Sequence, residues 1–310
     1  PLDFTETGLL AARTDLDQGT LSVIFLLLIG GLGVKAALVP LHGWLPQAMI
    51  APAPVSALLH AVAVVKAGAF GIVRVVYDVY GIEFAAELGL LTPLALLASL
   101  TIVYGSVRAL FQDELKKRLA YSTVSQVSYI ALGTALFGPI ASIGGIVHLV
   151  HQGLMKITLF FCAGNYAETL GIHHISEMRG VGRRMPWTTA AFTLGALGMI
   201  GVPPMAGFVS KWYLANGALA AGQDWVLWVL LASGLLNAAY FLPILYKAWF
   251  QEPQGEWPEE RQYGRFETHW MLLLPPVLTG VLALLVGLLA HAPYSALEWV
   301  RLIAFREYGQ

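Results

Sequence analysis

Charged residues are scarce in this sequence of 310 residues. Asp, Glu, Lys and Arg together make up 12% of the chain, whereas soluble domains contain about 25%. The formal net charge of −1 excludes the strongly basic surface with which proteins bind nucleic acid. With 57% hydrophobic residues and a mean hydropathy of +0.67, the composition predicts an all-α integral membrane protein, because the alternating pattern of a β-barrel is also missing.

Cysteine is almost absent. The single Cys162 excludes an intrachain disulfide and has no partner for a metal site. His173, His174 and Glu177 lie close together, but no distant ligands complete a metal set. Phosphate-binding loops and a catalytic Ser/His/Asp constellation are missing too. We therefore expect no cofactor, no metal and no catalytic residue, and a transporter subunit that is not an enzyme by itself. Membership of a redox-driven translocase stays open.

Apolar runs long enough to cross a bilayer recur along the chain. We place about eight transmembrane helices, at residues 20–50, 54–77, 88–111, 117–137, 140–167, 187–221, 225–249 and 269–291. The resulting divisions are an extracytoplasmic lead-in (1–19), a transmembrane domain (20–249), a cytoplasmic loop (250–268) and a C-terminal helix with its tail (269–310). The chain opens with proline instead of methionine, so we expect a fragment or a split chain.

Two of these spans exceed the length of a straight crossing, which takes about 20 residues. Each has proline in its interior, Pro40 in the first span and Pro203 and Pro204 in the sixth. Proline removes a backbone donor and interrupts a helix. Both spans are therefore predicted to be broken helices.

Lysine and arginine are distributed unevenly between the predicted loops. Cytoplasmic loops of membrane proteins collect these residues. Eight crossings place Arg108, Lys116, Lys117, Arg118, Arg179, Arg183, Arg184, Lys247, Arg261 and Arg265 on one side, and Arg13, Arg74, Arg301 and Arg306 on the other. We expect a multi-pass protein of a bacterial-type cytoplasmic (inner) membrane, with the N-terminus of this chain outside or periplasmic.

Four lysines stand inside apolar stretches, namely Lys35, Lys66, Lys156 and Lys211. A charge at the middle of a membrane helix costs about 2.5–3.5 kcal/mol. A chain tolerates this for function or through pairing, and the interiors of these spans contain almost no Asp or Glu. Ion movement is therefore the first hypothesis.

The positions of three of these lysines are informative. Lys35 and Lys211 each stand near a proline break, and this pairing of an ionisable residue with an interrupted helix is typical of inverted repeats around a site at the membrane midplane. The alternative is a lysine that snorkels from a helix end. Lys66 is predicted near the centre of an unbroken span. His60 lies six residues earlier on a different helix face, so it packs between helices or relays protons.

His148, Gln152 and Lys156 recur at every fourth position of one span and form a polar stripe. His151 stands beside them. Such a stripe lines a hydrated path or makes hydrogen bonds to neighbouring helices. The sequence leaves both interpretations open.

Four stretches carry a resemblance to a known family: GVKAALVPLHGWLP (33–46), APAPVSALLH (51–60), LKKRLAYSTVSQ (115–126) and GVPPMAGFVSK (201–211). From about residue 20 to 250 the chain resembles the proton-translocating antiporter family. That family comprises the antiporter-like membrane subunits of respiratory complex I, the large subunits of Mrp-type Na⁺/H⁺ antiporters, and membrane subunits of related hydrogenases. Within it the chain looks nearer to the Mrp D-type subunit.

The resemblance implies part of an inverted-repeat fold of about fourteen spans, of which the eight here correspond to the seventh to fourteenth. The earlier helix with the family's acidic partner, a glutamate, is then missing. Other membrane subunits, the missing N-terminal helices or a homologous subunit would be its partners. The ions carried would be H⁺ alone or Na⁺ with H⁺.

These residues lead to a hypothesis for the proton pathway. Lys66, His148, Lys156 and Lys211, with Lys35 at the side where protons enter, would form a polar axis at the membrane midplane. His60, His151 and Gln152 are secondary candidates. The rival is a non-conducting structural membrane subunit that docks partners of a hydrogenase or NADH dehydrogenase-like complex, with its lysines paired to carboxylates.

Overall fold

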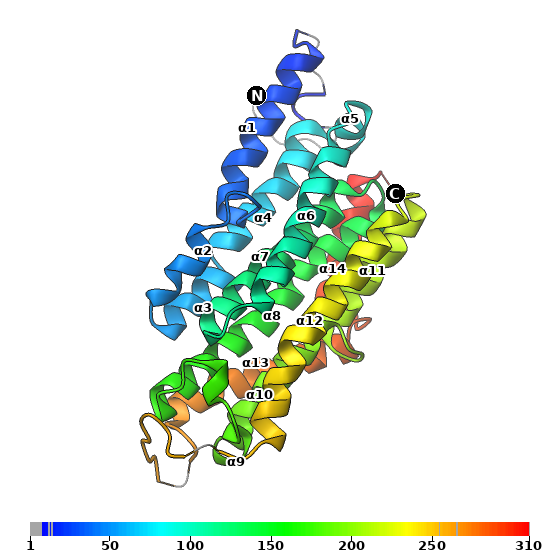
Figure 1. Cartoon of the computed structure of the whole chain (residues 1–310). Coiled ribbons are helices and arrows are strands. Elements are labelled where there is room, and N and C mark those ends of the chain that lie inside the picture. The colour runs from blue at the N-terminus through cyan, green and yellow to red at the C-terminus, as the bar shows by residue number, and fades with distance from the viewer. Residues whose placement is uncertain (1–7, 12, 14, 254, 265, 310) are drawn as a thin grey trace.

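The computed structural model describes residues 8–11, 13, 15–253, 255–264 and 266–309 (Figure 1). Apart from two isolated β-bridges, the regular structure in these ranges is helical. The predicted all-α membrane fold is thereby confirmed. Part of the lead-in at 1–19, and Arg265 of the predicted cytoplasmic charges, lie outside the described residues.

The helices follow one another along the chain with short connections. They are α1 (Gln18–Ala36), α2 (Trp44–Gln47), η1 (Ala48–Ile50), α3 (Ala53–Ala61), α4 (Val64–Arg74), η2 (Val75–Tyr80), α5 (Ile82–Glu87), α6 (Leu91–Leu110), α7 (Leu115–Ala135), α8 (Pro139–Leu170), η3 (Ile175–Glu177), α9 (Val181–Arg184), α10 (Pro186–Ile200), α11 (Ala206–Ala220), α12 (Trp225–Phe250), α13 (Trp270–Leu288) and α14 (Ala296–Glu307).

Six helical segments in the described part of the chain are long and apolar enough to cross a membrane: α1, the segment α3–η2, α6, α8, α12 and α13. The two other predicted spans have different forms. Helix α7 has 21 residues, but hydroxyl and amide side chains make it more polar. The span at 187–221 consists of α10 and α11, each of 15 residues.

The first predicted break is present. Helix α1 ends at Ala36, and Ala37 adopts the left-handed conformation with φ 56°. Helical structure resumes only at Trp44, so Pro40 lies in the connection. Lys35 thus occupies the last turn of the first half of its span.

The second break is present too. Helix α10 ends at Ile200, and Gly201 takes a φ of 93°, a conformation that residues with a Cβ rarely adopt. Helix α11 begins at Ala206, so Pro203 and Pro204 fall between the two halves. Lys211 lies on the second half.

The prediction that Lys66 lies in an unbroken span was wrong. Helix α3 ends at Ala61, and Val62 and Ala63 have φ, ψ values of −127°, −53° and −93°, −77°. Helix α4 starts at Val64 and passes into the π-helix η2. Lys66 therefore lies in the first turn of a new helix, next to a third interruption.

Helix α8 lies at the centre of the bundle. It is 32 residues long and packs against α7, α11, α13, α3, α10 and α14 (Figure 1). Most residues on it are buried. Its central place brings the stripe of His148, Gln152 and Lys156 within reach of α4 and α11, which carry Lys66 and Lys211.

Different segments of the chain meet at the two ends of the bundle. At one end the backbone N–H of Leu115 donates to the carbonyl of His173 at 2.9 Å, and Gly180 to Lys247 at 3.0 Å. At the other end the backbone N–H of Gly138 donates to the Tyr308 hydroxyl at 2.9 Å. Of the described charges, the larger predicted set therefore lies near the first end.

Candidate functional site

Lys66 is buried among residues of α8. Its side chain is 8% exposed, and its Nζ donates to the carbonyl oxygen of Leu149 at 2.8 Å. It is close enough to His148, His151 and Lys156 to interact with each electrostatically. The first turn of α4 therefore places Lys66 beside the middle of the polar stripe.

Lys156 is fully buried on α8. Its Nζ donates to the carbonyl oxygen of Leu119 at 3.0 Å and to the hydroxyl of Ser122. Both partners belong to α7. A buried cation is tolerated only where hydrogen-bond acceptors replace water, and α7 supplies two of them.

His148 connects Lys66 with the second broken helix. Its Nδ1 lies 2.7 Å from the hydroxyl of Ser210 on α11, and it interacts electrostatically with both Lys66 and Lys211. Its ring centroid is 5.2 Å from that of Tyr129. The imidazole is therefore within electrostatic range of both lysines.

Lys211 binds the end of the helix before the break. Its Nζ donates to the carbonyl oxygens of Met199 at 2.8 Å and Ile200 at 2.9 Å. The last four carbonyls of a helix lack partners within it, and they carry its negative dipole end. The interruption between α10 and α11 thus builds the acceptor site that holds this lysine, and the Tyr129 ring lies 5.4 Å from Nζ.

The three secondary candidates, His60, His151 and Gln152, are fully buried. His60 stacks on Phe160 with ring centroids 4.6 Å apart, and it faces Lys156 instead of Lys66. Among the described residues, no side-chain nitrogen or oxygen of His60, His151 or Gln152 makes a hydrogen bond. Buried polar atoms of this kind are normally satisfied by ordered water, so these three side chains suit a hydrated interior.

Lys35 stands apart from the other four residues. Its side chain is exposed on α1, and it makes no side-chain hydrogen bond or ion pair with the described residues. Its backbone packs on α4, where a Cβ added to Gly68 would lie 2.8 Å from the Lys35 carbonyl carbon. The structure therefore joins four of the five predicted pathway residues and leaves Lys35 on the outer face.

Carboxylates do not neutralise these lysines within the described residues. The ion pairs there involve Arg13, Arg74, Lys117, His174, Arg183, Arg184, Arg261, His291 and Arg301 as cations. Lys35, Lys66, Lys156 and Lys211 are in none of them. The side chains of Lys66, Lys156 and Lys211 instead donate to carbonyl and hydroxyl oxygens.

The family model described as "NADH:quinone oxidoreductase/Mrp antiporter, TM" matches residues 2–236, which is most of the chain. The chain belongs to this family. The predicted resemblance is thereby confirmed.

Relatives within the family come from several kinds of complex. NADH-quinone oxidoreductase subunit N of Desulforudis audaxviator is 38% identical over 298 residues, covering 92% of this chain and 59% of that protein. A chain of the Mrp complex from Dietzia sp. has a TM-score of 0.84 at 26% identity, covering 98% of this chain and 61% of that one. For a chain of respiratory complex I from Thermus thermophilus the TM-score is 0.78, also at 26% identity, covering 95% and 61%.

This member of the antiporter family spans about 60% of the length of these relatives. The sequence relative named above is a subunit of NADH-quinone oxidoreductase, whereas the higher of the two TM-scores belongs to a chain of an Mrp complex. The predicted preference for the Mrp D-type branch therefore stays a prediction.

Sequence reasoning missed a group of polar residues between α7 and α12. Gln126 Nε2 donates to Asn237 Oδ1 at 3.3 Å, and the Tyr240 hydroxyl donates to the same oxygen. All three residues are fully buried. The sequence does contain one indication of this group: Asn237 is an amide in the middle of the apolar run 225–250.

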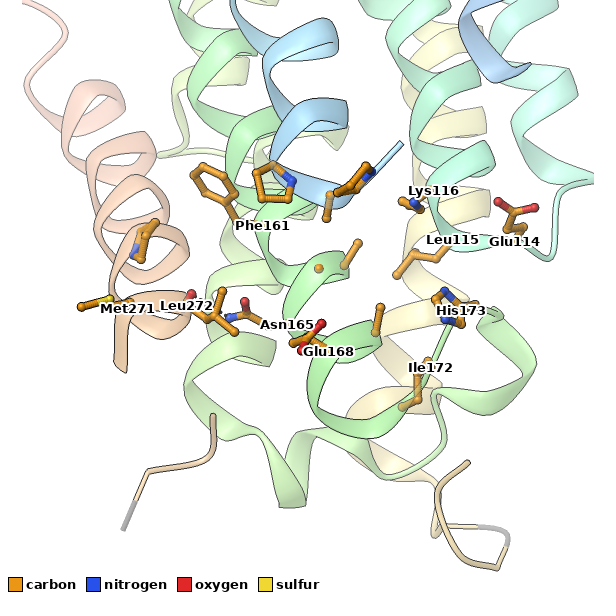
Figure 2. Close-up of a pocket in the computed structure, with 17 residues that line it drawn as sticks. Glu114, Leu115, Lys116, Phe161, Asn165, Glu168, Ile172, His173, Met271 and Leu272 are labelled. Carbon is orange, nitrogen blue, oxygen red and sulfur yellow. Dashed lines mark hydrogen bonds between the residues drawn. The ribbon is translucent and has the colours of Figure 1, made fainter. Parts of the chain in front are cut away.

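A cavity of the described structure lies elsewhere. Figure 2 shows it between α3, α7, α8 and α13, with a volume of about 620 Å³. The charged side chains that line it already have partners within the protein. Glu114 forms an ion pair with Lys117, and Glu168 forms one with Arg261. Lys116 Nζ donates to the carbonyl oxygen of Ala51. None of the pathway candidates lines it, so the cavity is separate from the lysine site.

Proposed function

We propose that this chain is part of a proton-translocating membrane subunit of a multisubunit cation/proton antiporter or complex I-like assembly. The observation that carries the proposal is the buried series Lys156, Lys66, His148 and Lys211, in which each member interacts electrostatically with the next. No described carboxylate pairs with these lysines, which leaves their protons free to exchange.

Electrostatic coupling supplies the driving mechanism. Two unit charges about 10 Å apart interact by roughly 1.7 kcal/mol at an effective dielectric of 20, which corresponds to more than a tenfold change in a proton-binding constant. Protonation of Lys156 thus favours release from Lys66, and His148 passes the proton toward Lys211. Water hydrogen-bonded to the orphaned polar atoms of His151 and Gln152 completes the path.

Lys35 is the member that faces a partner. It is exposed on α1, a helix that also exposes apolar residues such as Leu26 and Leu27, which are 66% and 72% exposed. The covering element would be the N-terminal helices of the same fold or a homologous subunit, and it would bring the acidic partner that this chain lacks. The protons would enter on this side, exchanged against Na⁺ or driven by redox chemistry in other subunits.

Proton uptake by the intact complex in reconstituted vesicles tests the proposal. Lys66→Ala and Lys211→Ala are each expected to abolish transport while the complex still assembles. Lys117→Ala is the control, because this lysine lies on the surface with 46% of its side chain exposed. Wild-type transport in both variants would leave the non-conducting, partner-docking subunit as the better explanation.

A further inference from the structure

The cavity beside α8 in Figure 2 has no role in the proposed pathway. Its volume of about 620 Å³ falls within the range of about 300–1,000 Å³ that is typical of sites for small molecules. Helices α3 and α13 both pack on α8, and residues of all three helices line the cavity. The space is large enough for a bound molecule, and its lining indicates which kind of molecule fits.

One part of the lining is apolar. It is formed by Pro54 of α3, Phe161 of α8, and Met271, Leu272 and Pro275 of α13. All three helices belong to segments that are long and apolar enough to cross a membrane. An apolar wall within such segments suits the acyl chain of a lipid, because burial of hydrocarbon is favourable in proportion to its area.

Lys116 on α7 contributes a positive charge to the cavity. Among the described residues its Nζ makes one hydrogen bond, to the carbonyl oxygen of Ala51 at 2.9 Å. An ammonium group has three donors, so donors remain for a ligand. Basic pockets between membrane helices on the cytoplasmic side bind the head groups of anionic phospholipids, and the predicted cytoplasmic end of the bundle is the one that contains Lys116. A phosphate group therefore suits this side chain.

Hydrogen-bond acceptors line the same cavity. Glu114 and Glu168 each form one ion pair, and a carboxylate has about four acceptor sites, so both retain unused ones. Asn165 is 2% exposed, and its Nδ2 donates to the carbonyl oxygen of Leu272 at 3.0 Å. Its Oδ1 lies on the other side of the amide and accepts no hydrogen bond from the described residues. These acceptors favour a ligand that also donates, and the two carboxylates oppose a head group that is only anionic.

We propose that this cavity binds a phospholipid whose head group carries both a phosphate and a primary amine, as in phosphatidylethanolamine. The phosphate accepts from Lys116 on α7, and the ammonium donates to Asn165 and Glu168, which are neighbours on the surface of α8 (Figure 2). One acyl chain lies against the apolar wall formed by α3, α8 and α13. The inference does not depend on the proposed function, because none of the pathway residues lines the cavity.

Lipid binding to the purified intact complex tests the proposal. The complex is stripped of lipid in detergent, mixed with equal amounts of phosphatidylethanolamine, phosphatidylglycerol and phosphatidylcholine, and examined by native mass spectrometry. Lys116→Met keeps the length of the side chain and removes the donors. It is expected to weaken the binding of one phosphatidylethanolamine molecule about tenfold or more, the effect of losing one charge-assisted hydrogen bond. Lys117→Met is the matched control, because the neighbouring Lys117 does not line the cavity, and it is expected to keep wild-type binding.

A second pair of variants tests the space and not the charge. Ala167 of α8 lines the cavity, so Ala167→Trp fills it and is expected to expel the same lipid molecule. Ala239 is exposed on α12, outside the cavity, and Ala239→Trp is expected to retain the lipid. Because the substitution is the same, a difference in binding between the two variants reports on the cavity.

Several results would overturn the inference. Wild-type binding in both Lys116→Met and Ala167→Trp would mean that the lipid binds elsewhere, and a complex that retains no lipid would mean that the cavity holds none. Equal or stronger binding of phosphatidylglycerol, which lacks the amine, would contradict the role of the acceptors. Glycerophosphoethanolamine, the head group without acyl chains, is expected to compete weakly. If it displaced the lipid at equal concentration, the site would be one for a soluble phosphate compound.

Discussion

Lys211 shows how a single residue joins stability to function. Its ammonium caps two carbonyls at the end of α10, and hydrogen bonds to a charged group contribute about 1.5–3 kcal/mol each. Lys211→Met keeps the length of the side chain and removes the donors. We expect it to lower the melting temperature of the complex as well as abolish transport.

The comparison variant is Lys117→Met, because an exposed ion pair such as Lys117–Glu114 contributes about 0–1 kcal/mol. Calorimetry of the two variants measures the difference. Equal melting temperatures would show that the contacts of Lys211 do not hold the break between α10 and α11 together.

How far the sequence predicts the site is clear from individual residues. The lysines stand out because a charge in an apolar run needs an explanation. Sequence alone could not show that Lys66 meets α8, since the contact depends on how α4 packs. It also could not show that Gln126 meets Asn237, because these residues are far apart in the chain.

At the scale of elements, α1 and α4 are held together by a contact that leaves no room for a side chain. A Cβ on Gly68 would lie 2.8 Å from the backbone and the Cβ of Lys35, closer than such atoms approach. Gly68→Ala is therefore expected to separate the two helices, to destabilise the protein by about 1–3 kcal/mol and to lower transport by displacing Lys35.

Gly234→Ala in α12 is the matched control, because nothing lies within 4 Å of an added Cβ there. Alanine favours a helix over glycine by about 0.5–1 kcal/mol, so this variant is expected to be neutral or slightly more stable. Denaturation of both variants checks the pair. A Gly68→Ala protein as stable as wild type would contradict the close approach of α1 and α4.

The broken helices divide into those that local sequence predicts and one that it does not. Pro40 and Pro203-Pro204 lie in their breaks, where proline removes a backbone donor, although α12 and α13 continue through Pro243 and through Pro275-Pro276. The interruption at Val62 and Ala63 has neither proline nor glycine. It arises within an apolar run, so tertiary packing overrides the local helix preference.

At the scale of the whole molecule, orientation in the membrane is open to direct measurement. The uneven distribution of Lys and Arg predicts that the loop 250–268 is cytoplasmic and that α5 lies outside. Glu256→Cys is then expected to react with a membrane-impermeant maleimide only from the cytoplasmic side, and Glu83→Cys only from the other side. The native Cys162 is fully buried and gives little background.

Reaction of both engineered cysteines from the same side would mean that the number of crossings between them is not odd. That result would overturn the predicted span count, in which residues 83 and 256 are separated by five crossings. Reaction from opposite sides with the polarity reversed would overturn the predicted orientation alone.

The central claim is that buried lysines take up and release protons, and Lys66→Arg tests it most directly. Arginine keeps the positive charge and can donate to the Leu149 carbonyl as Lys66 does, but it stays protonated at all accessible pH values. In vesicles containing the intact complex, the variant is expected to assemble normally and to transport protons at no more than the background rate. A wild-type rate with arginine at this position would show that only the charge matters, and it would contradict the account.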